Sequence, residues 1–116
     1  MTDINLQNKN REQRVLTAED IAIDIYNGTV MRNGQNIYLS MLEYRILLLL
    51  VLNKGKVVSR QTILDSISYG NYLFLNENTL TVYIKRIREK LGDDSCTPHI
   101  IKTVRGKGYM VGDMDF

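Results

Sequence analysis

Hydrophobic residues recur along this chain with two different periods, and the change of period separates strands from helices. Ile21, Ile23 and Ile25 alternate with other residues, which predicts a half-buried strand. The pairs Asn27-Gly28 and Asn33-Gly34 are strong hairpin signals on either side of a short run. We therefore expect a small N-terminal antiparallel sheet of three or four strands. Its expected strands are 15–17, 21–26, 29–32 and 36–39.

The pattern then changes to a helical one. Ser40 followed by Glu43 is a capping-box pattern, and it predicts a helix that runs through LEYRILLLLVLN, residues 42–53, and stops at Gly55. This segment is so apolar that the helix must be nearly surrounded by other elements. Ser59 predicts the start of a second, short helix over 60–67. The residues expected to face the core are Leu42, Ile46, Leu49 and Leu50, widened by Leu47, Leu48 and Val51, and then Ile63, Leu64 and Ile67.

A third helix is predicted over 79–91, with Asn78 as its N-cap and Gly92 just past its end. Its apolar residues are three and four positions apart and share one stripe, while the opposite face is largely polar and cationic. The stripe consists of Leu80, Ile84, Ile87 and Leu91, and the opposite face carries Val82, Lys85, Arg86 and Glu89. Most such faces are only solvated, so this helix alone is weak evidence for nucleic-acid binding.

Two segments flank the third helix. The stretch SYGNYLFLNE at 68–77 is expected to be a loop rich in aromatic residues. After the helix, HIIKTV and YMVG read as two strands joined by the tight turn RGKG, whose tip holds Arg105 and Lys107. The order of elements predicts an α+β fold. It is a winged helix-turn-helix with a small N-terminal antiparallel sheet, three helices and a C-terminal β-hairpin wing.

Charge changes the picture through its distribution. The whole chain has 116 residues, 24% of them charged, and a net charge of only +2. The segment 78–109 holds seven Lys and Arg against three acids, so the remainder is slightly acidic. A positive C-terminal third on a mildly acidic body fits a polyanion-binding surface confined to one side of one domain. We assign residues 1–14 to a polar lead-in or interdomain linker and 15–116 to the domain.

Other kinds of site find little support. Cys96 and His99 are too few to hold zinc, and one histidine cannot furnish a convincing catalytic triad. Gly106-Lys107-Gly108 lacks the frame of a phosphate-binding loop, and Asp93-Asp94 is expected only to make the turn more soluble. No apolar run is long enough for a membrane span, no leader is evident, and a single cysteine suits a cytoplasmic protein. We expect neither an enzyme nor a cofactor.

Four segments together resemble a known family. LSMLEYRILLLL, GKVVSRQTIL, NTLTVYIKRIREKLGDD and IIKTVRGKGYMV occur in the order found in the C-terminal effector domains of OmpR/PhoB-type response regulators, the transcription factors of bacterial two-component systems. The similarity extends over about residues 16–111. It implies that the third helix enters the major groove and that the wing, 100–111, reaches the minor groove. It also implies control by phosphorylation of an upstream receiver domain that this chain lacks.

The resemblance also implies which residues contact DNA. Arg86 stands where members most often read a base, Val82 suits a thymine methyl, and Lys85 and Arg88 suit phosphates. In the wing, Thr103 suits a phosphate and Arg105 the minor groove, whereas Tyr109 is expected to pack. The full expected set is Thr79, Thr81, Val82, Tyr83, Lys85, Arg86, Arg88, Thr103, Arg105 and Lys107. Thr81 and Tyr83 stand where members often have Asp and His, so the base preference cannot be copied from a relative. Members also commonly have a Trp at the end of the second helix, where this chain has Ser68 or Tyr69, next to the loop that contacts RNA polymerase in activators.

The implied partners are double-stranded DNA with repeated promoter half-sites, a second copy of the protein on that DNA, and RNA polymerase through the 68–77 loop. The main alternative is a winged helix that serves as a protein-interaction module. Arg86 and Arg105 favour DNA, because such a module would not need cations on both the third helix and the wing.

Overall fold

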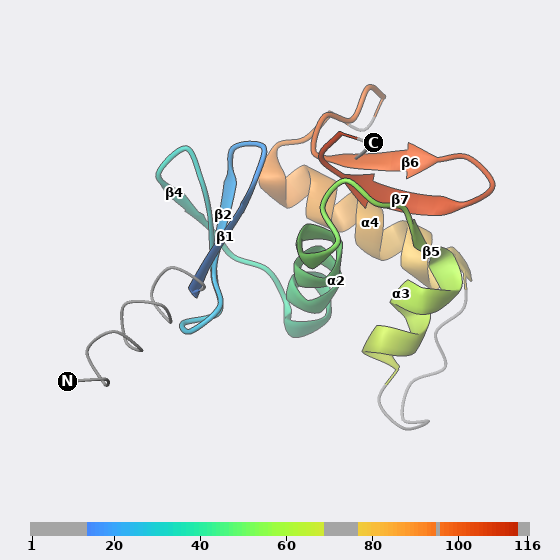
Figure 1. Cartoon of the computed structure of the whole chain (residues 1–116), viewed down its shortest axis with the longest axis horizontal. Helices are drawn as coiled ribbons and strands as arrows, with labels where there is room; N and C mark the ends of the chain where they lie inside the picture. The colour runs from blue at the N-terminus through green and yellow to red at the C-terminus, as the bar shows by residue number, and fades with distance from the viewer. Residues whose placement is uncertain (1–13, 69–76, 95, 114–116) are drawn as a thin grey trace.

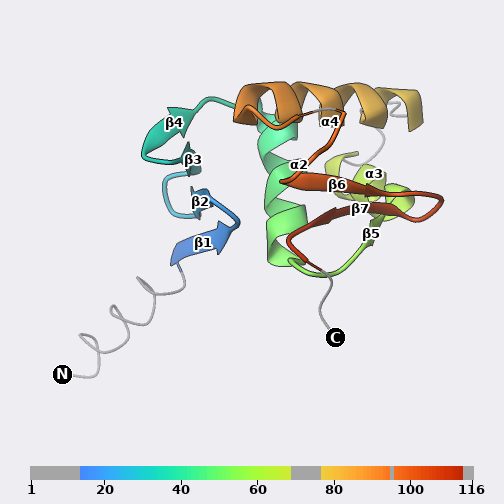
Figure 2. The same ribbon diagram turned by 90° about the horizontal axis from the view of Figure 1, so that it is seen from above.

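The computed structural model describes residues 14–68, 77–94 and 96–113 (Figures 1 and 2). Four strands come first, then helices interleaved with a short strand, then the C-terminal hairpin. The elements are β1 (Val15–Ala18), β2 (Ile21–Asp24), β3 (Thr29–Arg32), β4 (Gln35–Ile37), α2 (Met41–Leu52), β5 (Val58–Ser59), α3 (Arg60–Ile67), α4 (Glu77–Leu91), β6 (Ile101–Val104) and β7 (Gly108–Val111). This confirms the predicted winged helix-turn-helix.

The first four strands form an antiparallel sheet in chain order, β1-β2-β3-β4. Its register places Ile23 opposite both Leu16 and Val30, and Ile21 and Ile23 are buried as their spacing predicted. The predicted strand over 21–26 is too long, because β2 ends at Asp24 and Ile25, beyond it, is 39% exposed. Gly28 and Gly34 adopt positive φ in the two hairpin turns. The sheet lies on one side of α2, with the C-terminal hairpin on the other (Figure 2).

Helix α2 begins as predicted. Ser40 and Glu43 form both hydrogen bonds of the capping box, the backbone N–H of Ser40 donating to Glu43 Oε1 at 2.8 Å. The predicted stretch, which ended at Asn53 before a stop at Gly55, is one residue too long, because the helix ends at Leu52 and Asn53 is its C-cap. The side chain of Asn53 donates to the carbonyl of Leu49 at 2.8 Å and closes the last turn before Gly55 is reached.

Burial along α2 differs in detail from the predicted stripe. Ile46, Leu47 and Leu50 are fully buried, whereas Leu42 and Leu49 are only partly buried. A helix with apolar residues on every side has no distinct stripe in its sequence, so the neighbouring elements decide which residues are covered.

Helix α4 carries the predicted apolar stripe, and its four members are each at most 2% exposed. It ends at Leu91, and Gly92 follows with a φ of +74°. Asn78 is not the N-cap, because the helix already begins at Glu77. The first backbone N–H groups of any helix lack an intrahelical acceptor, and an Asn side chain can supply one from within the first turn as well as from the N-cap. The presence of Asn78 therefore did not fix the residue at which the helix begins.

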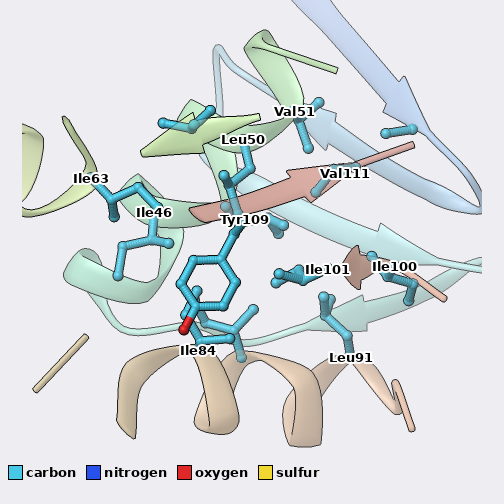
Figure 3. Close-up of a cluster of buried hydrophobic side chains, with 14 of the residues drawn as sticks. Ile46, Leu50, Val51, Ile63, Ile84, Leu91, Ile100, Ile101, Tyr109 and Val111 are labelled. Carbon is cyan, nitrogen blue, oxygen red and sulfur yellow. The ribbon is translucent and has the colours of Figure 1, made fainter. Parts of the chain in front are cut away.

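A second sheet has the order β5-β7-β6 and ties the hairpin to the helices. The two-residue strand β5 pairs with the start of β7, Val58 opposite Tyr109 and Ser59 opposite Gly108. A Cβ added at Gly108 would lie 2.0 Å from the carbonyl oxygen of Val58, so only glycine fits this close approach. Figure 3 shows the core that this sheet shares with α2 and α4.

Asp93 was expected only to make a turn more soluble, and that expectation is wrong. Its carboxylate is buried, with 9% of the residue exposed. It accepts hydrogen bonds from the backbone N–H groups of His99, Ile100 and Ile101, at 2.8 to 3.2 Å. The side chain thus binds the segment that leads into β6 and fixes the base of the hairpin.

Candidate nucleic-acid interface

The outward face of α4 presents the side chains that the sequence placed there. Val82 is 46% exposed, and Lys85 and Arg86 are exposed one turn further along. Tyr83 is half-buried against the core, and the guanidinium carbon of Arg86 lies 5.9 Å from the centre of its ring. This cation–π contact supports the long Arg86 side chain while leaving it accessible to a ligand.

The turn of the hairpin presents two further cations. Arg105 and Lys107 are exposed beside Gly106, whose φ is +75°. The backbone N–H of Lys107 donates to the carbonyl of Val104 at 2.9 Å and closes the turn. In the part of the chain that the structure describes, the side chains of Lys85, Arg105 and Lys107 form no ion pair. Their charge is therefore available to an external anion.

Arg88 differs from the other predicted cations because it is half-buried and bonded within the domain. Its guanidinium donates to the carbonyl of Ile101 at 2.7 and 3.1 Å and to the hydroxyl of Thr103 at 2.9 Å. Burial lowers the pKa of Arg88, and the nearby carboxylate of Asp93 opposes that shift. Arg88 thus joins α4 to β6, and it orients the exposed hydroxyl of Thr103.

Arg60, at the first position of α3, was not among the predicted site residues. It donates to the hydroxyl of Tyr109 at 2.7 Å and to the hydroxyl of Thr81 at 2.9 Å. Tyr109 is 4% exposed, which agrees with its predicted packing role. Figure 3 shows its ring directed from β7 toward α4. The sequence offered only the arginine after the helix cap as a signal, and nothing there indicated its partners.

The far end of α4 is held by the remainder of the domain. Arg32 in β3 donates to the carbonyl of Leu91 at 2.6 Å. Lys90 pairs with the buried Glu43 of α2, with 2.6 Å between Nζ and Oε1. These contacts fix α4 to both the N-terminal sheet and α2, so its outward face has a defined position.

The ten predicted residues all come from α4 and the adjoining hairpin, which the bonds of Arg88 join directly. Thr79 and Tyr83 are half-buried, and Thr81 is exposed but bonded to Arg60. The surface therefore combines exposed cations, hydroxyls and one apolar side chain, the groups that bind phosphates and base edges.

Other chemistry is limited within residues 14–68, 77–94 and 96–113. No cluster of three or more His, Cys, Asp or Glu able to hold a metal ion occurs there. Among these residues no helix has the length and apolar character required to cross a bilayer. The aromatic stretch 69–74 and the lead-in 1–13 lie outside the described residues.

Comparison with known proteins places these features in a family. Residues 34–111 match the family described as "Transcriptional regulatory protein, C terminal". The chain is 36% identical over 100 residues to the uncharacterized transcriptional regulatory protein YcbL of Bacillus subtilis, covering 86% of this chain and 44% of that protein. It is 38% identical over 99 residues to the response regulator protein GraR of Staphylococcus aureus (strain Newman), covering 85% and 43%. The chain thus spans less than half the length of these relatives.

Solved structures agree with the sequence relatives. The DNA-binding domain of RstA from Klebsiella pneumoniae, crystallised with the RstA box, superposes with a TM-score of 0.75 at 31% identity, covering 85% of this chain and 97% of that one. The response regulator DrrB of Thermotoga maritima, an OmpR/PhoB homologue, gives a TM-score of 0.77 at 34% identity, covering 95% and 52%.

Proposed function

The chain belongs to the OmpR/PhoB family of response regulators, as their C-terminal DNA-binding domain, and from this premise we propose which of its surfaces reads DNA. The outward face of α4 enters the major groove, and the turn between β6 and β7 reaches the neighbouring minor groove. The observation that carries the proposal is the set of exposed cations on both elements, Lys85 and Arg86 on α4 and Arg105 and Lys107 on the turn.

Base selection falls on Val82 and Arg86. A guanidinium can donate two parallel hydrogen bonds to O6 and N7 of guanine, and each such pair contributes roughly 1–3 kcal/mol of discrimination. The exposed side chain of Val82, one turn away, suits contact with a thymine methyl group. The contact of Arg86 with the ring of Tyr83 restricts the guanidinium before it binds, which reduces the entropy lost on binding.

Phosphate binding falls on Lys85, Lys107 and the hydroxyl of Thr103. Thr103 accepts a hydrogen bond from Arg88, so its own proton is directed to another acceptor, and a phosphate oxygen supplies one. These contacts strengthen binding at any sequence and make it salt-dependent. Thr79, Thr81 and Tyr83 border the same face of α4 and add contacts there. Arg105, on the turn between β6 and β7, binds in the neighbouring minor groove.

The proposal extends to assembly and control. One domain with this few contacts binds modestly, so two copies on repeated half-sites gain affinity through their effective concentration. In the longer protein, phosphorylation of a receiver domain preceding this one would control that pairing. The sequence 68–77 would supply a contact with RNA polymerase. The site of action is then the cytoplasm.

Selection from a pool of random duplexes tests the proposal. The expected result is one enriched sequence motif, bound with an affinity that falls steeply as salt rises. A chain that enriches no motif, or that captures a protein partner in a manner indifferent to salt, would instead support the protein-interaction module.

A further inference from the structure

Arg60 reaches two other elements from the start of α3. Its Nη1 donates to Tyr109 Oη at 2.7 Å, and its Nη2 donates to Thr81 Oγ1 at 2.9 Å. Its guanidinium carbon also lies 5.5 Å from the centre of the Tyr109 ring. A single planar group therefore ties α3 to β7 and to the outward face of α4.

The ring of Tyr109 receives a second guanidinium. The guanidinium carbon of Arg88 lies 5.9 Å from the ring centre, and the same side chain donates to Thr103 in β6. A continuous series of contacts thus runs from Thr81 through Arg60, Tyr109 and Arg88 to Thr103. It begins on the proposed major-groove element and ends on the wing.

The geometry restricts what each member can do. Tyr109 is 4% exposed, so nearly all of the residue is packed within the domain, and its hydroxyl accepts a hydrogen bond from Arg60. The fork of an arginine holds two acceptors in fixed directions, whereas a lysine offers one compact charge that cannot reproduce both bonds and the contact with the ring. The connection between α4 and the wing therefore depends on guanidinium geometry as well as on positive charge.

We propose that Arg60 is a positioning residue for DNA recognition. Through Tyr109 and Thr81 it fixes the wing relative to α4, and so sets the spacing at which the major-groove bases and the adjacent minor groove are read together. The inference rests on the proposed function, because it presumes that both elements touch DNA.

A simpler role for Arg60 is direct attraction to a phosphate, and substitutions separate the two. Tyr109→Phe removes only the hydroxyl that Arg60 bonds, and it deletes no charge. Arg60→Lys keeps the charge but loses the fork, and Arg60→Gln loses both. Tyr38→Phe is the matched control, because Tyr38 is 81% exposed and lies in the segment between β4 and α2.

The experiment measures the affinity of the full 116-residue chain for its selected duplex and for a duplex with one base pair inserted between the major-groove and minor-groove portions. Each protein is measured over a series of salt concentrations, and circular dichroism confirms that each variant is folded at the assay temperature. The double variant Arg60→Lys/Tyr109→Phe completes a thermodynamic cycle that reports whether the two residues act as one unit.

If Arg60 is a positioning residue, Arg60→Lys and Tyr109→Phe should each weaken DNA binding by roughly threefold to tenfold. This is less than the full contribution of one hydrogen bond to a charged group, because the bond acts on DNA affinity only through the position of the wing. The double variant should bind DNA with the same affinity as whichever single variant binds more weakly. The salt slope should stay unchanged, and the penalty for the inserted base pair should shrink in all three. Tyr38→Phe should match the unsubstituted chain.

Direct phosphate binding predicts the opposite pattern and would overturn the inference. Tyr109→Phe and Arg60→Lys would then bind almost as well as the unsubstituted chain, while Arg60→Gln would lower the salt slope by about 0.9. Losses that simply add in the double variant, or an unchanged insertion penalty, would also overturn it. If the unsubstituted chain selects no sequence at all, the proposed function fails instead.

Discussion

Replacing the buried Asp93 by Asn should destabilise the domain strongly, although the two side chains have nearly the same shape. The carboxylate of Asp93 uses both oxygens to accept from three backbone N–H groups. In Asn the oxygen keeps at most part of this set, and the amide N–H₂ group faces backbone donors. The substitution therefore places an N–H₂ donor against backbone N–H donors in a buried site, and it leaves no cavity.

The magnitude follows from the number of bonds lost. A hydrogen bond to a charged group contributes roughly 1.5–3 kcal/mol, and a buried donor left without an acceptor costs about 1–3 kcal/mol. Losing one such bond outright and weakening a second costs about 2–4 kcal/mol, a large part of the roughly 5–15 kcal/mol that stabilises a typical domain. Where water enters the site and accepts from the freed N–H groups, the loss of stability should lie at the lower end of this range, about 2 kcal/mol.

Urea unfolding followed by circular dichroism measures this loss. With a slope of about 2 kcal/mol per molar urea, the middle of the range for small proteins, the midpoint should fall by roughly 1–2 M. Asp94→Asn is the matched control, because Asp94 is the exposed neighbour, and its carboxylate accepts hydrogen bonds from Cys96, at 2.8 Å, and from Thr97 at the surface. If Asp93→Asn and Asp94→Asn lower the midpoint equally, the buried acceptor role is refuted.

Three further predictions concern other contacts. Burial alone would raise the pKa of Glu43, but the hydrogen bonds from Lys90 and Ser40 lower it overall. Because this pKa is depressed in the folded state, ionised Glu43 stabilises the domain above its unfolded pKa, and the stabilisation is lost as pH falls through the folded pKa. Lys90→Met should therefore make the free energy of unfolding, measured by denaturant titration, less dependent on pH in the acid range. A Lys90→Met protein with an unaltered acid profile would show that the pair contributes nothing. Gly108→Ala should lower the melting temperature markedly, since the new methyl group would meet a carbonyl in β5, whereas Gly106→Ala meets no atom within 4 Å and is strained only by its φ of +75°, so equal losses in the two would contradict the steric argument. Lys107→Ala should weaken DNA binding about equally on all duplexes and reduce the salt slope by about 0.9, and a loss confined to one sequence would exclude a phosphate contact.

The sequence predicted most of the fold because its signals were local. The Asn-Gly turns, the capping box at Ser40 and the stripe on α4 each depend on residues within a few positions of one another. Strand β5 was missed because two residues give no periodicity, and its pairing with β7 joins positions about fifty residues apart. Long-range contacts of this kind leave no local pattern to read.

The candidate site was predictable in its exposed part and less so in its internal connections. Spacing alone identified the outward face with Lys85 and Arg86. The roles of Arg60, Arg88 and Asp93 depend on which distant backbone or hydroxyl group each one meets, and spacing does not carry that information. The sequence predicts that a polar residue near a helix end is exposed to solvent, and it gives the same prediction for Asp94, which is exposed, and for Asp93, which is buried.

The central claim is that the outward face of α4 reads bases through Arg86, and the most direct measurement compares two binding profiles. The unsubstituted chain and Arg86→Ala are each selected against the same random duplex pool. We expect that Arg86→Ala binds its best site more weakly by about 1–3 kcal/mol and loses its preference at one guanine while keeping its preferences at the remaining positions. An Arg86→Ala profile that retains the same preference at every position, with unchanged affinity, would contradict it.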